Sequence, residues 1–143
     1  MPLTPLDNLA RIGKLKAEPV GDAELKGLAR SGRARLRDAE NVELSIDSRF
    51  DLAYNAAHAL ALAALRLHGY RSENRYLVFR CLEHTLNLPK EQWRVLDEAH
   101  RRRNIAEYED GIDIDKELVA AVTRVAKEVA KRVDTLIATP TKK

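Results

Sequence analysis

The sequence predicts an all-α protein: an antiparallel bundle of four to five helices with an extra helix at the N-terminus. Three observations support this fold class. Ala, Leu, Arg and Glu, all good helix formers, are abundant in the 143 residues. Apolar residues recur at three- and four-residue steps, and we find no alternating strand pattern. Six glycines and five prolines fall mostly between these periodic stretches, which suits helices joined by short loops.

Residues 1–20 are predicted to form a helical arm. Thr4 and Pro5 suit the N-cap and the first turn of a helix, and apolar residues follow at helical spacing. The helix is expected to run almost to Pro19. Because Gly13 weakens it, we expect the arm to be loosely attached.

Residues 21–137 are predicted to form the bundle itself. Asp22 suits the cap of a helix whose leucines lie on one side. The other side of that helix is basic, and we interpret it as a solvated face: Lys26, Arg30, Arg33, Arg35 and Arg37. A turn-rich joint follows, and then a helix from about Ser48 to His68 that closes at Gly69. That helix is apolar nearly all round, so it should be the central element.

Three further helices complete the predicted bundle. One spans about Asn74–Leu86, and the next begins at Pro89 and runs to about Glu109. Asp113 or Asp115 caps the last helix, which carries a long apolar stripe: Leu118, Val122, Val125, Val129, Val133 and Leu136. The tail, 138–143, is expected to be disordered.

The composition excludes several classes of protein. A formal charge of +3 is too small by itself to indicate a nucleic-acid binder. The single cysteine allows no internal disulfide, and the N-terminus has no signal-peptide pattern, so we expect a cytoplasmic protein. The most apolar run is short and contains His58 and Arg66, so no membrane partner is expected.

The sequence predicts neither a cofactor nor a metal site. It has no Gly-rich phosphate loop and no zinc-binding histidine pair, and its four histidines never occur three or four residues apart. His58 is best interpreted as a hydrogen-bonded core histidine rather than a metal ligand.

The stretch EAHRRRNIAEYED, residues 98–110, holds the main candidates for chemistry. On a helix, a row at steps of four, three and four shares one face: Asp97, Arg101, Asn104 and Tyr108. A neighbouring row contains His100, Arg103 and Glu107. Such a face can grip a phosphate or a carboxylate. The alternative, which the residues alone favour, is pairing within the helix between Asp97 and Arg101 and between Arg103 and Glu107.

Two segments resemble the HEPN family. SRFDLAYNAAHALALAALRLHGYR is similar to the second helix of HEPN domains, with its Arg-Phe pair and Ala-rich run ending in Gly. LDEAHRRRNIAEYED is similar to a late helix of that family, where an Arg-Asn pair precedes a His and often a Tyr. The resemblance covers about residues 22–136.

The resemblance implies a bundle of four or five helices that is usually a homodimer. Many HEPN proteins are metal-independent RNases, often bacterial toxins encoded beside a minimal nucleotidyltransferase. In these, the motif Arg and His meet across the dimer, where a ribose 2′-OH attacks the phosphate. The His then moves a proton, and the Arg steadies the phosphate charge.

The present sequence departs from that pattern at the motif histidine. In one register Arg103-Asn104 matches the Arg-Asn pair and Tyr108 takes the histidine position. In the other, Arg101 matches the Arg, Ala106 replaces the His, and Tyr108 matches the following tyrosine. Tyrosine, with an ordinary pKa of about 10, is a poor base at neutral pH.

Three hypotheses follow. The first is a module that binds RNA or a nucleotide through Arg101, Arg103, Asn104 and Tyr108, with Asp51, Asn55 and His58 completing the pocket. The second is an RNase toxin with a divergent site, whose catalytic candidates are His100, Arg103 and Tyr108, with His100 or His58 moving the proton. The third is a structural module whose polar residues lie in a dimer or partner interface. A nucleotidyltransferase partner would be expected to modify Tyr108.

Overall fold

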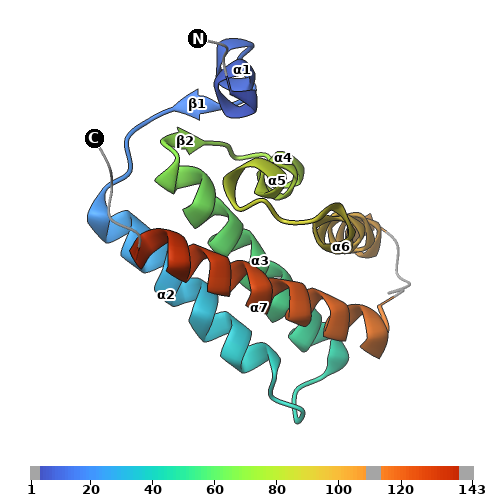
Figure 1. Ribbon diagram of the computed structural model, residues 1–143. Coiled ribbons are helices and arrows are strands. Elements are labelled where there is room, and N and C mark those ends of the chain that lie inside the picture. The colour runs from blue at the N-terminus through green and yellow to red at the C-terminus, as the bar shows by residue number, and fades with distance from the viewer. Residues whose placement is uncertain (1–3, 109–113, 139–143) are drawn as a thin grey trace.

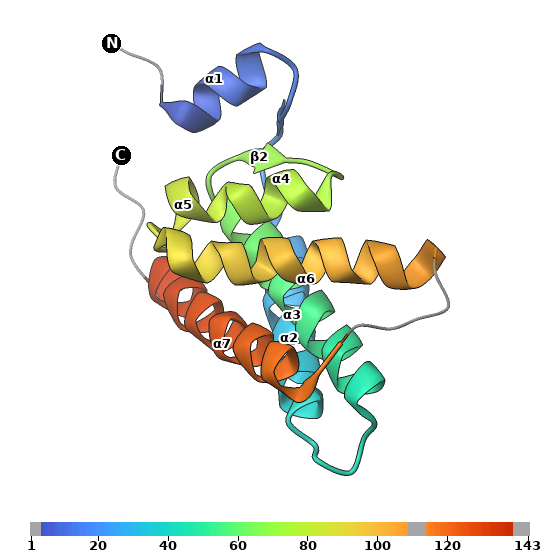
Figure 2. The ribbon, with the colours of Figure 1, turned by 90° about the vertical axis from the view of Figure 1, so that its right-hand side faces the viewer.

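The computed structural model describes residues 4–108 and 114–138. In this part the chain is mostly helical, its helices pack together, and it contains one very short two-stranded ladder (Figures 1 and 2). The elements, in order, are α1 Pro5–Arg11, β1 Lys16–Ala17, α2 Asp22–Ala39, α3 Ile46–Leu67, β2 Tyr70–Arg71, α4 Arg75–Arg80, α5 Leu82–Thr85, α6 Lys90–Tyr108 and α7 Lys116–Ala138.

Helix α3 is the central element, as the sequence predicted. The Ser45 side chain accepts a hydrogen bond from the Ser48 N–H at 3.1 Å and so caps the first turn. Gly69, with φ 89°, follows the last turn and supplies the left-handed backbone that often ends a helix. The alanines of α3 are almost all fully buried, which lets the neighbouring helices approach closely.

Helices α2 and α7 lie side by side and run in opposite directions (Figure 1). Arg33 pairs with Asp134, and seven residues later on α2 Glu40 pairs with Lys127, which lies seven residues earlier on α7. This pairing shows that the two helices are antiparallel. Both helices pack on α3. The predicted apolar stripe of α7 faces the core, with Val122, Val125, Val129 and Val133 buried.

The N-terminal arm differs from the prediction. Helix α1 ends at Arg11, and Gly13, with φ 82°, turns the chain away from the helical path. The expected helix almost to Pro19, and the expected absence of strands, are therefore wrong. Lys16 and Ala17 instead pair antiparallel with Arg71 and Tyr70.

The arm is also fastened to the body rather than loosely attached. Leu6 and Leu15 are buried in the same core as the long helices. Arg66 of α3, fully buried, donates to the backbone carbonyls of Glu18 at 2.8 Å and Pro19 at 2.9 Å. It also donates to both carboxylate oxygens of Glu24, at 2.9 and 3.1 Å, and to the backbone carbonyl of Tyr70 at 3.3 Å, so the buried guanidinium is well satisfied.

The region between α3 and α6 positions the candidate site. The predicted single helix over residues 74–86 is divided at Cys81 into α4 and α5, and the Asn74 side chain caps α4. Helix α6 begins just after Pro89 and lies beside α4 (Figure 2). No helix within residues 4–108 and 114–138 is long and apolar enough to span a membrane.

Candidate functional site

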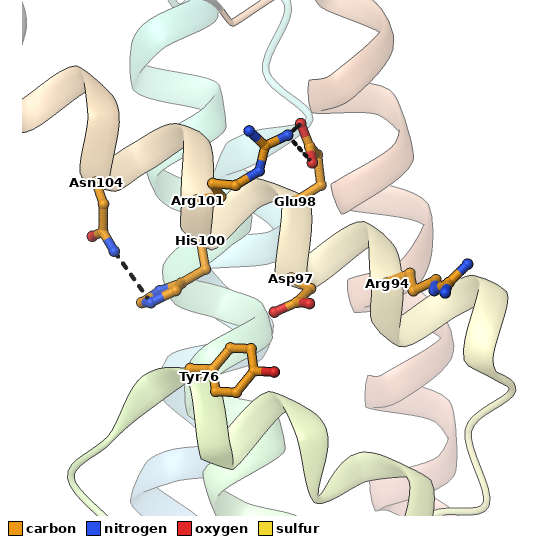
Figure 3. A pocket seen from close by; sticks show the side chains of 7 residues that line it. All are labelled: Tyr76, Arg94, Asp97, Glu98, His100, Arg101 and Asn104. Atoms are coloured by element: carbon orange, nitrogen blue, oxygen red, sulfur yellow. Dashed lines mark hydrogen bonds and ion pairs between the residues drawn. The ribbon is translucent and has the colours of Figure 1, made fainter.

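An open cavity of about 650 Å³ lies along α6, bordered by α4 (Figure 3). Its lining residues are Tyr76, Arg94, Asp97, Glu98, His100, Arg101 and Asn104. The structure therefore brings Asp97, Arg101 and Asn104 to one face, as the helical spacing predicted. The side chain of Tyr108, the fourth member of that row, lies outside the described residues.

His100 forms a hydrogen bond with Tyr54 of the central helix. The Tyr54 side chain is completely buried in α3, and its hydroxyl lies 2.8 Å from Nδ1 of His100. On the other side of the ring, Nδ2 of Asn104 lies 3.3 Å from Nε2 (Figure 3). With the amide donating, Nε2 is the nitrogen without hydrogen, and Nδ1–H donates to the tyrosine oxygen. The imidazole is thus fixed in orientation.

The surroundings keep His100 neutral. Partial burial lowers the pKa of His100, and the positive charges of Arg75 and Arg103 lower it as well, whereas Asp97 opposes them. A neutral imidazole at pH 7 can accept a hydrogen bond or a proton through Nε2, at the edge of the cavity.

Arg101 makes a different ion pair from the one expected. The predicted partner was Asp97, but Nη2 of Arg101 contacts the two oxygens of Glu98 at 2.6 and 2.7 Å. Nε of Arg102 also donates to Glu98, at 2.7 Å. Hydrogen bonds from these two guanidinium groups lower the pKa of Glu98. The carboxylate of Asp97 is consequently left in the cavity lining.

Arg103 points away from the cavity. Its guanidinium lies over the ring of Tyr54, 5.1 Å from the centroid, and its Nε lies 3.7 Å from Oδ1 of Asp51. The predicted partner of Arg103 was Glu107, whose side chain lies outside the described residues. Arg103 is therefore placed to support Tyr54, which in turn positions His100.

Asp51, Asn55 and His58 do not line the cavity. Asn55 accepts a hydrogen bond from Arg75 at 2.9 Å, and Arg75 lies 5.4 Å from the Tyr54 ring centroid. The ring of His58 packs edge-on against Phe79, and no partner of its buried Nε2 lies within the described part of the chain.

Four further residues of the site were not predicted from the sequence: Glu98, described above, and Tyr76, Arg94 and Tyr54. Tyr76 borders the cavity with 41% of its surface exposed, and its hydroxyl accepts a hydrogen bond from Arg80 at 2.8 Å. Arg94 lies three residues before Asp97, so helical spacing would have added it to the face. Tyr54 belongs to the helix that was predicted to be central, and it is buried in the core, but the need of a buried tyrosine hydroxyl for a partner was not used to link it to the site.

The charge of the cavity is balanced. The positive charges of Arg94 and Arg101 are balanced by the two carboxylates of Asp97 and Glu98, so the lining as a whole attracts anions only weakly. Within residues 4–108 and 114–138, no group of three His, Cys, Asp or Glu side chains is placed to hold a metal ion. Comparisons with protein-family models, curated proteins and solved structures found no significant match to this chain.

Proposed function

We propose that this chain is a HEPN-like helical module that binds RNA or a nucleotide in the cavity between α4 and α6. The observation that carries the proposal is the fixed orientation of His100, with Asn104 on one side and the exposed ring of Tyr76 nearby. The similarity of two of its segments to HEPN helices adds support, and it extends the proposal to a homodimer with a four- or five-helix bundle.

The side chains of the cavity suit a base better than a phosphate chain. Tyr76 offers an exposed aromatic face on which a base can stack. Asn104 supplies an amide, Asp97 a carboxylate acceptor and His100 an imidazole, which together can hydrogen-bond the edge of a base. Arg94 forms no ion pair within the described residues, and Arg101 contacts Glu98 through Nη2 alone. Each of these guanidinium groups could hold a phosphate of its own.

A second candidate function is metal-independent cleavage of RNA, and the state of His100 favours it. Once the Asn104 amide has released Nε2, a neutral His100 could take the proton from a ribose 2′-OH as that oxygen attacks the phosphorus, and the 5′-oxygen would leave with a proton from a second donor. Arg101 would steady the phosphate charge. Toxin activity and a nucleotidyltransferase partner, like the cytoplasmic location, rest on the sequence alone.

The first test measures binding of adenosine 5′-monophosphate and a labelled 12-nucleotide RNA to the full chain. Tyr76→Ala removes the stacking surface and should weaken binding by about 5- to 100-fold, since base–aromatic stacking is worth about 1–3 kcal/mol. Asn104→Ala should weaken it by several-fold. The control is Asn8→Ala, an exposed helical asparagine far along the chain. Equal affinities for all four proteins would contradict the proposal.

The same RNA, incubated with the chain and excess EDTA, separates binding from cleavage. We expect it to remain intact. Fragments ending in 2′,3′-cyclic phosphate, formed by the wild type and not by His100→Ala, would instead identify the chain as an RNase.

A further inference from the structure

A basic groove runs between α2 and α7, separate from the α4–α6 cavity. Two hollows, of about 500 and 330 Å³, lie along it, and they share Arg33 and Asp134 in their lining. None of the residues that line either hollow lines the α4–α6 cavity. The groove follows the antiparallel contact of the two helices that Figure 1 shows.

The cations of the groove form a regular pattern. On α2 they occur at steps of four, three and four, and on α7 at a step of four: Lys26, Arg30, Arg33, Arg37, Lys127 and Lys131. Three of the six are paired with carboxylates, namely Asp22, Asp134 and Glu40. Arg30, Arg37 and Lys131 form no ion pair in the described part of the chain. The groove thus has three positive charges in excess, as many as the formal charge of the whole chain.

The floor of the groove favours a charged backbone over a base. Its apolar lining is aliphatic, with Leu36, Ala130 and Ile137, and among the residues that the structure describes no aromatic side chain lines either hollow. The four cations on α2 span twelve residues, and eleven steps of 1.5 Å make about 16 Å. Phosphates follow one another at about 3.4 Å even along one strand of a duplex, so this length suits several phosphates of one chain and not a single phosphate.

We infer that the α2–α7 groove binds the phosphate backbone of a single-stranded RNA. The positive excess and the length of the stripe indicate a polyanion, and the choice of RNA rests on the function proposed above. The cavity and the groove would then contact different parts of the RNA. The charge-balanced α4–α6 cavity takes a base with its phosphate, and the groove supplies the electrostatic attraction that the cavity lacks.

The test uses fluorescence anisotropy of a labelled 20-nucleotide single-stranded RNA with the full chain, from 50 to 200 mM KCl. The groove variant is Arg30→Gln/Arg37→Gln/Lys131→Gln. Its matched control, Lys14→Gln/Lys90→Gln/Lys116→Gln, makes the same charge change at exposed lysines outside the groove. Three lost phosphate contacts should reduce the slope of log K against log[KCl] by about 2 and the affinity by about 10- to 100-fold. The control should retain most of both.

Two results would overturn the inference. One is equal affinity and equal slope in the two triple variants, after circular dichroism has shown that both are folded. The other is that polyglutamate or duplex DNA binds the wild type more tightly than the RNA does. Tyr76→Ala separates the two proposals, because it should lower affinity without changing the salt slope. If Tyr76→Ala binds RNA as the wild type does while the groove variant fails, the groove assignment stands and the cavity assignment falls.

Discussion

Tyr54 connects the central helix, α3, to the side chains of the candidate site and positions His100. Its hydroxyl reaches His100, and the guanidinium groups of Arg75 and Arg103 lie over its ring at 5.4 and 5.1 Å. Each of these contacts joins α3 to another helix, α4 or α6. The orientation of His100 therefore depends on side chains that never enter the cavity.

His58 should make the stability of the chain depend on pH. Burial, together with the charge of Arg75 and that of His100 when it is protonated, lowers the pKa of His58 to about 4. Between the ordinary histidine value of about 6.5 and pH 4, the unfolded chain binds a proton that the folded chain does not. The free energy of unfolding is thus highest above pH 6.5 and falls as the pH drops, by about 1–3 kcal/mol for this residue.

Urea unfolding of His58→Leu at pH 7 and at pH 4.5 tests this. Leucine cannot bind a proton, and it removes the buried Nε2, which has no hydrogen-bond partner among the described residues. Between pH 7 and pH 4.5, the free energy of unfolding of the variant should therefore fall by about 1–3 kcal/mol less than that of the wild type. His84→Gln, which removes an exposed histidine, is the control. A pH dependence of His58→Leu equal to that of the wild type would show that His58 does not bear the proton linkage.

At the scale of the elements, the contact of α2 with α3 depends on a glycine. A Cβ on Gly32 would lie 2.6 Å from Cγ of Leu60, a fully buried side chain of α3. Gly32→Ala should therefore destabilise the chain by about 1–3 kcal/mol, as overpacked cores do. Gly27, on the same helix, has no atom within 4 Å of the added Cβ. Gly27→Ala should stabilise by about 0.5–1 kcal/mol.

Thermal or urea unfolding of the two variants gives this comparison directly, because they make the same chemical change five residues apart. Opposite signs are expected. A Gly32→Ala variant as stable as Gly27→Ala would mean that α2 and α3 are packed less closely than the structure shows.

The long helices could be predicted from the sequence because their periodic apolar faces extend over many turns. The α7 stripe and the all-round burial of α3 are of this kind. The β1–β2 ladder could not, because two residues per strand carry no periodicity. It is stabilised by Arg66, which donates to Tyr70 of β2 and also to Glu18, Pro19 and Glu24, more than forty residues earlier in the chain.

The candidate site, like the fold, could be predicted from the sequence only where its contacts lie within one helix. Helical spacing identified the shared face of Asp97, Arg101 and Asn104, because that relation lies within one helix. Arg103 lies over the ring of Tyr54, and the hydroxyl of Tyr54 contacts His100. Both contacts join residues about fifty positions apart in the chain. Local patterns do not encode such contacts, so Arg103 was assigned to the binding face and Tyr54 was not linked to the site.

For the molecule as a whole, the two surfaces predict two separable properties. The groove should set how affinity depends on salt, since it holds the excess of positive charge. The cavity should set preference among bases, since it holds the aromatic face and the amide. Both surfaces are built on helices that pack against α3 or α7, so neither needs a rearrangement of the fold to form.

The measurement that tests the account most directly is a titration of the isotope-labelled chain with adenosine 5′-monophosphate, followed by NMR. If the cavity binds the nucleotide, the largest shifts occur at Tyr76, Arg101 and Asn104 and at the ring signals of His100. The amides of Arg30 and Arg37 should move little. An absence of shifts at millimolar nucleotide, or largest shifts on α2 and α7, would contradict the proposed cavity.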